Sequence, residues 1–173
     1  MSLRNRHAKT FFAPTVRFLI VTLGGTHFAL HADHVQGLLT IEEAGAVPVL
    51  TVQGETYVRI DLAARLQLPS DLNGPETRVV LLRKENARGH LHVDQVHGLK
   101  ELEPSQVLPL PRQFQGEEQR WYQGLILFAD SVAMILNPAW VMEGCDKGAV
   151  IGTVERQDER FVTVRQAIVG GQV

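Results

Sequence analysis

The segment LHADHVQGL at residues 30–38 returns as LHVDQVHGL at residues 91–99. Six of the nine positions are identical, more than two unrelated segments of this length would share by chance. One pair of strand-like runs precedes each copy, and another pair follows it. The chain is therefore predicted to contain two copies of one unit, with a spacing too long for a solenoid.

Runs rich in β-branched and aromatic residues flank the repeated segments and predict short strands in hairpins. Gly24–Gly25 joins the first pair, since these glycines allow the positive φ angles of a two-residue turn. Asp61 is expected to cap a short helix, and Pro138 to open another. The expected pairs are Val16–Leu23 with Thr26–Leu30, Val49–Val52 with Thr56–Ile60, Arg78–Arg83 with His90–Val93, and Trp121–Phe128 with Val132–Leu136. Because closure removes exposed sheet edges, we predict a mainly β fold of two small barrels with short helices.

The expected domain boundaries follow from breaks in this pattern. Residues 69–76 contain two prolines and a glycine, the strongest break in the middle of the chain. The predicted parts are a flexible N-terminal arm at 1–15, a first lobe at about 16–70, a second lobe at about 77–143, and a C-terminal extension at 144–173. Within the extension, Ala149–Val154 and Arg160–Val164 are expected to form a β-hairpin. This hairpin either covers a sheet edge or docks a partner.

Composition excludes several classes of protein. A net charge of −2, from 17 basic and 19 acidic residues, gives no basic surface for nucleic acid. The single Cys145 excludes an internal disulfide and a thiol-rich metal site, which favours a cytoplasmic protein. The longest apolar runs are far shorter than the roughly 20 residues of a membrane helix, so no direct membrane insertion is expected.

Four histidines, His31, His34, His90 and His92, have spacings at which imidazoles bind zinc. However, His31 and His92 occupy equivalent positions of the repeat, so each is expected to serve the structure of its own lobe. Asp33 and Asp94 are likewise expected to cap or form turns. The sequence contains no nucleophile elbow, P-loop or dinucleotide-binding fingerprint. We therefore expect no enzyme activity, no cofactor and no metal.

The repeat also places four apolar residues symmetrically: Val35, Leu38, Val96 and Leu99. Two interpretations of these residues are open. They are either ordinary core residues or the lining of a protein-binding groove at the seam between the lobes.

Several segments together resemble the CheW-like domain of bacterial chemotaxis coupling proteins and of their histidine kinase. The matching segments are Phe18–Gly25 with Phe28–Leu30, Val58–Leu66, Val79–Leu82, Val93–Gly98 and Gly124–Leu136. The resemblance covers about residues 16–143 and implies two five-stranded, SH3-like barrels. It also implies a non-catalytic adaptor that links the cytoplasmic tip of a chemoreceptor to the regulatory domain of the kinase. A receptor helix would then dock in the groove lined by the four apolar residues of the repeat.

The chain departs from the family pattern in its first lobe. The family usually carries Asn-Leu-Arg-Gly where this chain reads Thr51-Val52-Gln53-Gly54, so the arginine is missing. The preceding segment also looks several residues shorter. Gln53 and Gly54 are therefore candidate protein-contact residues in an altered loop. Two further interpretations remain open: a CheW-like module that has lost kinase coupling and binds another signalling protein, and a small-molecule-binding or enzymatic two-barrel protein.

Overall fold

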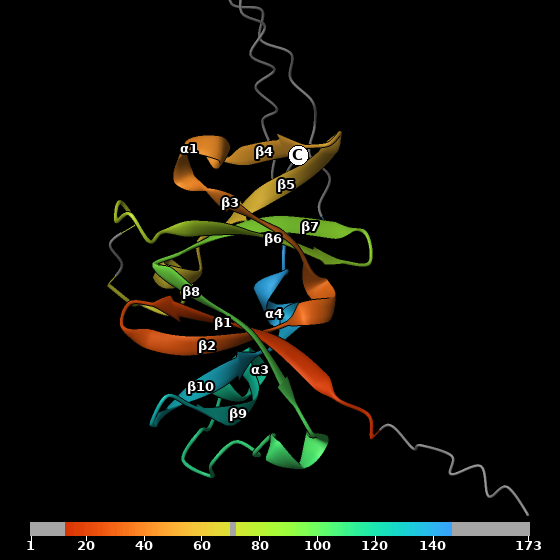
Figure 1. Ribbon diagram of the computed structural model, residues 1–173, viewed down its shortest axis with the longest axis vertical. Coiled ribbons are helices and arrows are strands. Elements are labelled where there is room, and N and C mark those ends of the chain that lie inside the picture. Colours follow the sequence, from red (N-terminus) through yellow and green to blue (C-terminus); the bar gives the residue numbers. More distant parts are fainter. Residues whose placement is uncertain (1–12, 70–71, 147–173) are drawn as a thin grey trace, which may run out of the picture.

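The computed structural model describes residues 13–69 and 72–146. Two five-stranded sheets are stacked along the long axis of this region (Figure 1). The predicted class, a mainly β fold with short helices, is confirmed. The hairpin expected within 144–173 and most of the expected N-terminal arm lie outside the described residues.

Sheet A, the lower sheet in Figure 1, has the strand order β8-β1-β2-β10-β9. Its strands are β1 (Val16–Leu23), β2 (Thr26–His31), β8 (Gln95–Leu102), β9 (Tyr122–Phe128) and β10 (Ser131–Leu136). Sheet B, the upper sheet, has the order β3-β6-β7-β5-β4. Its strands are β3 (Val35–Thr40), β4 (Val49–Val52), β5 (Glu55–Ile60), β6 (Arg78–Lys84) and β7 (Ala87–Val93).

The expected division into lobes at about 16–70 and 77–143 is wrong, because each sheet takes strands from both halves of the chain. The first hairpin, β1–β2, belongs to sheet A together with β8, β9 and β10. The corresponding hairpin of the second half, β6–β7, belongs to sheet B together with β3, β4 and β5. β2 pairs in parallel with β10, as β7 does with β5. The two repeat units have therefore exchanged their first hairpins.

The repeated segments are the points at which the chain crosses from one sheet to the other. The first copy ends β2 in sheet A, passes through the short helix η1 (Ala32–His34), and begins β3 in sheet B. The second copy ends β7 in sheet B and begins β8 in sheet A. Both copies therefore carry the chain from one sheet to the other, through η1 in the first copy and through the single residue Asp94 in the second.

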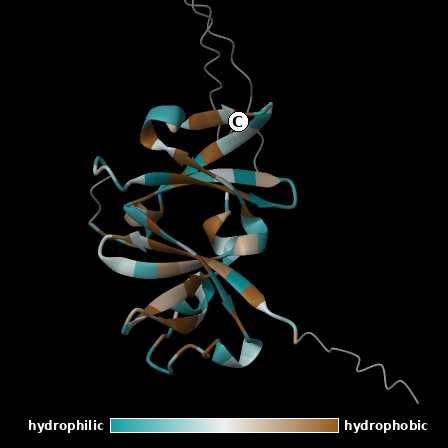
Figure 2. Cartoon of the chain, in the orientation of Figure 1, coloured by the Kyte–Doolittle hydropathy of each residue, from teal (hydrophilic) through white to brown (hydrophobic). Residues whose placement is uncertain are grey.

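The described residues form three apolar clusters, and the largest of these lies between the two sheets. Each sheet is buried on both faces, so its strands alternate between two clusters. Along β1, Phe18 and Ile20 lie in the cluster enclosed by sheet A, whereas Leu19 and Val21 lie in the cluster between the sheets. Sheet B encloses a third cluster around Tyr57. Figure 2 shows hydrophobic and hydrophilic residues following one another in bands along the strands.

The helices are short, and their caps are visible in the sequence. Asp61 accepts a hydrogen bond from Ala64 N at 3.2 Å and begins α2 (Leu62–Arg65), as expected. Asn137 caps α4 (Pro138–Val141), which begins with the expected proline. The remaining helices are α1 (Ile41–Ala44), η2 (Pro104–Gln106) and α3 (Glu118–Trp121). Over the described ranges, no helix has the length and apolar character needed to cross a membrane.

Candidate functional site

Strands β3 and β8 each contain a β-bulge at the same position of the repeat. Val35 lies opposite Leu82 and Gly37 opposite Leu81, so Gln36 is the extra residue in β3. In β8, Val96 lies opposite Val21 and Gly98 opposite Ile20, so His97 is the extra residue. A bulge shifts the alternation of side chains by one residue.

The bulges explain the Val-x-x-Leu spacing of the repeat. In a regular strand, residues three positions apart point to opposite faces. Beyond the bulge, Leu38 lies opposite Val80, and Leu99 lies opposite Leu19. Val80 and Leu19 both belong to the cluster between the sheets. The valine and the leucine of each copy therefore share the face that looks toward the other sheet.

The two residue types differ in exposure. Leu38 is 45% exposed and Leu99 is 63% exposed. Val35 and Val96 are partly buried and pack against the cluster between the sheets. Because β3 and β8 are edge strands of opposite sheets, the leucines lie at the rim of the core rather than inside it. The valines thus contribute to the core, whereas the leucines offer apolar surface.

A surface hollow lies between β3 of sheet B and β8 of sheet A. Leu38 of β3 and Val96 of β8 line it together. The other lining residues are Leu39, Thr40, Glu43, Glu76 and Arg78. The hollow is therefore lined by both apolar and charged side chains. We call the surface formed by Val35, Leu38, Val96 and Leu99 the β3–β8 face.

Gln53 and Gly54 lie apart from the hollow, in the turn between β4 and β5. Both are exposed, with φ angles of 49° and 80°, which is the backbone of a type I′ turn. The hollow is lined by no residue of this turn. The structure therefore separates the six candidate contact residues into two surfaces.

The equivalent turn in sheet A carries apolar residues that the sequence analysis did not select. Ala129 and Asp130 form it, with φ angles of 46° and 58°. Leu127 and Val132 are cross-strand partners beside it and are 64% and 42% exposed. In sheet B, the corresponding pair is Thr51 opposite Thr56. Comparing the two hairpins position by position would have revealed this difference. We call the Leu127–Val132 pair the β9–β10 tip.

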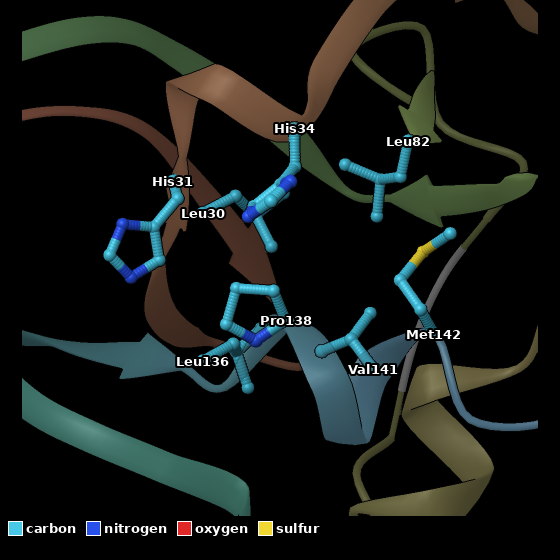
Figure 3. Close-up of a pocket in the computed structure, with 8 residues that line it drawn as sticks. All are labelled: Leu30, His31, His34, Leu82, Leu136, Pro138, Val141 and Met142. Carbon is cyan, nitrogen blue, oxygen red and sulfur yellow. The ribbon is translucent and has the colours of Figure 1, made fainter. Parts of the chain in front are cut away.

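The histidines of the first repeat lie beside a small apolar pocket (Figure 3). The lining residues are Leu30, His31, His34, Leu82, Leu136, Pro138, Val141 and Met142. His31 Nε2 lies 2.7 Å from Gln123 Oε1, and His34 Nδ1 lies 3.1 Å from the Arg83 carbonyl oxygen. Among the described residues, no three His, Cys, Asp or Glu side chains gather as metal ligands. Each ring thus lies within hydrogen-bonding distance of another group of the protein.

His90 and His92 lie on β7, within sheet B. His90 is fully buried, His92 is 8% exposed, and their ring centroids are 5.6 Å apart. Burial, followed by the neighbouring His92, lowers the pKa of His90 to about 4. Burial also lowers the pKa of His92, helped by the charge of Arg59. Burial therefore favours the neutral form of both rings.

Cys145 has the environment of a structural thiol. It is partly buried against the cluster between the sheets. Burial raises its pKa to about 11, against the opposing effect of the nearby Arg65. Because the thiolate is the reactive form, this environment disfavours nucleophilic chemistry at Cys145.

Comparisons with known proteins agree with this architecture. The scaffolding protein TtCheW from Thermoanaerobacter tengcongensis superposes with a TM-score of 0.62 at 16% sequence identity. The match covers 78% of this chain and 97% of that one, which shows a shared fold. A search of curated proteins finds no match. The family model of the CheW-like domain matches residues 17–144, which include all the strand residues of the described part of the chain except Val16. The chain therefore belongs to the CheW-like domain family.

Proposed function

We propose that the protein is a non-catalytic cytoplasmic adaptor in chemotaxis-type two-component signalling. Family membership supports this class of function, and the superposed relative is described as a scaffolding protein. The observation that carries the proposal is the β3–β8 face, where Leu38 and Leu99 remain 45% and 63% exposed beside a packed core. Exposed apolar surface with a polar rim is typical of protein-contact sites.

The proposed partner of the β3–β8 face is an amphipathic helix from the cytoplasmic tip of a chemoreceptor. An apolar strip of such a helix would pack on Leu38 and Val96 in the hollow between the sheets. Glu43, Glu76 and Arg78, which also line the hollow, provide charges of both signs for its polar residues. Rim charges of this kind select partners and steer association more than they add affinity.

The proposed partner of the second surface is the regulatory domain of a histidine kinase. The β9–β10 tip supports this part, because Leu127 and Val132 form an exposed apolar pair at the end of a hairpin. The β4–β5 turn, with Gln53 and Gly54, is the alternative contact. Its neighbouring strand positions carry threonines, so it offers hydrogen bonds rather than apolar area.

Binding measurements with single variants test both contacts. Isothermal titration calorimetry would follow the full chain with a receptor-tip fragment and, separately, with a kinase regulatory domain. We expect Leu38→Asp and Leu99→Asp to weaken receptor binding by about tenfold or more, because each buries a charge at the contact. Leu127→Asp should weaken kinase binding to a similar extent. Thr51→Asp, at the equivalent position of the other hairpin, is the matched control.

The pattern of results separates the alternatives. Binding to neither partner would overturn the adaptor proposal. Binding to the receptor without the kinase would instead favour a module that has lost kinase coupling, as the missing arginine at Gln53 suggests. A loss of kinase binding with Thr51→Asp but not with Leu127→Asp would move the kinase contact to the β4–β5 turn.

A further inference from the structure

Two histidines that the sequence analysis did not select meet at one hydroxyl group in sheet A. His27 Nδ1 lies 3.0 Å from Thr22 Oγ1, and His97 Nε2 lies 2.6 Å from the same oxygen. The centroids of the two rings are 5.3 Å apart, and the rings are nearly perpendicular, at 81°. One nitrogen of each imidazole is therefore directed at a common point.

Three neighbouring strands bring these residues together. Thr22 and His27 are cross-strand partners near the turn of the β1–β2 hairpin. His97 is the extra residue of the bulge in β8, which pairs with β1 on the side opposite β2. Because a bulge changes the direction in which its side chains point, it allows His97 to reach the middle strand.

The surroundings of the two imidazoles are partly apolar and open to solvent. The ring centroid of Phe128 lies 5.3 Å from that of His27 and 5.2 Å from that of His97. His97 is exposed, and His27 is partly buried. Lys100 Nζ, a nearby positive charge, donates to the Leu127 carbonyl oxygen at 2.7 Å. A small ion from solvent can therefore reach the two rings, beside an apolar wall.

The fold itself does not require imidazoles at these positions. Arg83 and Arg88 are the cross-strand partners at the equivalent place in sheet B. By the repeat, they stand in the positions of Thr22 and His27. Gln36, the extra residue of the β3 bulge, stands in the position of the β8 histidine. Since sheet B is built without imidazoles here, the needs of the architecture do not explain the pair in sheet A.

Paired imidazoles are suited to a divalent cation of the zinc class. Zinc bonds of 2.0–2.1 Å require the two nitrogens to be about 3.3 Å apart. Because both nitrogens lie within 3.0 Å of the same oxygen, they are less than about 6 Å apart, and a small rotation of the two rings covers the difference. The described residues supply no third His, Cys, Asp or Glu ligand, so water completes the coordination.

We propose that His27 and His97 form a two-histidine binding site for a divalent cation of the zinc class. The ligand atoms are Nδ1 of His27 and Nε2 of His97, the two nitrogens that face the Thr22 hydroxyl. The bound cation joins β2 to β8 across β1 and so stabilises the β8 bulge. The inference does not depend on the proposed adaptor function.

Isothermal titration calorimetry of the full chain with zinc chloride, in a buffer that does not chelate metals, tests the site. His27→Asn and His97→Asn should each weaken zinc binding by about tenfold or more, because each removes one of two protein ligands. Magnesium chloride should not bind at the same concentrations, since Mg²⁺ prefers oxygen ligands. His34→Asn is the matched control, because His34 Nδ1 lies 3.1 Å from the Arg83 carbonyl oxygen, away from this pair.

NMR of the histidine side chains gives a second measurement that needs no substitution. When zinc is added to the native chain, the imidazole nitrogen signals of His27 and His97 should shift together. Those of His31 and His34 should stay in place. This result would hold even if one of the asparagine variants failed to fold, which circular dichroism of each metal-free variant would reveal.

The remaining outcomes contradict the site. Absence of zinc binding by the native chain would overturn the proposal. Binding that survives His27→Asn and His97→Asn, or that weakens equally with His34→Asn, would place the ion elsewhere and also overturn it. A response of only one of the two histidines, in calorimetry or in NMR, would exclude a shared ion.

Discussion

The carboxylate of Asp94 accepts a hydrogen bond from the backbone N–H of Gly24 at 2.8 Å. Asp94 also donates its own backbone N–H to the Thr22 carbonyl at 2.9 Å. The first residue after β7 is thereby joined to the turn between β1 and β2, which belongs to the other repeat unit. Gly24 itself is required there, because its φ is 59° and a Cβ would lie 2.4 Å from the Pro69 carbonyl oxygen.

Replacing Asp94 should destabilise the protein more than replacing its repeat partner. Asp94→Ala removes a charge-assisted hydrogen bond and should lower the free energy of unfolding by about 1.5–3 kcal/mol. Asp33→Ala changes an exposed residue and should stay within about 0.5 kcal/mol of the native protein. Urea denaturation followed by circular dichroism measures both. Equal decreases in the free energy of unfolding for the two variants would show that the hydrogen bond between Asp94 and Gly24 does not stabilise the protein.

Substitution of the valines of the β3–β8 face should reduce stability, whereas substitution of its leucines should reduce binding with little loss of stability. Val96→Asp places a charge against the cluster between the sheets and should lower the free energy of unfolding by about 1–3 kcal/mol. Leu99→Asp, at a 63% exposed position, should cost less than about 1 kcal/mol. Thermal and urea unfolding would rank the two variants. The reverse order would mean that Leu99 is the core residue of the pair.

Acid should destabilise the protein through His90. Its pKa is lowered from 6.5 to about 4 in the folded state, so the unfolded chain binds more protons between these values. The free energy of unfolding is therefore unaffected by His90 above about pH 6.5. It decreases as the pH falls toward 4, by up to about 3 kcal/mol. His90→Phe should flatten this part of the stability profile, measured by urea unfolding from pH 7 to pH 4. An unchanged slope would place the acid sensitivity in other groups.

Arg65 should stabilise the contact between α2 and α4. Its Nη1 and Nη2 donate to the carbonyls of Val141 and Trp140 at 3.0 and 2.7 Å, and the guanidinium carbon lies 3.9 Å from the centroid of the Trp140 ring. Lysine cannot reproduce this planar arrangement. Arg65→Lys should therefore lower the free energy of unfolding by about 1–2 kcal/mol in urea denaturation. Arg83→Lys, at an exposed strand position, is the control and should be nearly neutral.

Local features of the fold were predictable from the sequence because neighbouring residues determine them. The Gly24–Gly25 turn, the Asp61 cap and the Pro138 helix start all depend on backbone preferences within a few residues. The capping box of α1, in which Thr40 and Glu43 exchange side-chain and backbone hydrogen bonds, was available to the same reasoning and was missed.

The membership of strands in sheets was not predictable in the same way. A repeat shows that two segments adopt the same structure, but it does not show which copy pairs with which. The apolar face of the repeat was recognised, yet its division into packed valines and exposed leucines depends on the bulges at Gln36 and His97. The sequence does contain the difference between the β9–β10 tip and the other hairpin, because Leu127 and Val132 stand where the other hairpin has Thr51 and Thr56, but the exposure of Leu127 is known only from the structure.

The exchange of hairpins has a consequence for the order in which a growing polypeptide can acquire its structure. Sheet B is built from consecutive strands and has all its members once residue 93 has been synthesised. Sheet A begins with residue 16 but receives its last strand only at residue 136. The β1–β2 hairpin therefore lacks its final neighbours, β8 and β10, until the ribosome has added more than half of the chain. During this interval β6 and β7 already occupy the position that an unexchanged first hairpin would take, so the earlier completion of sheet B would commit the chain to the exchanged topology.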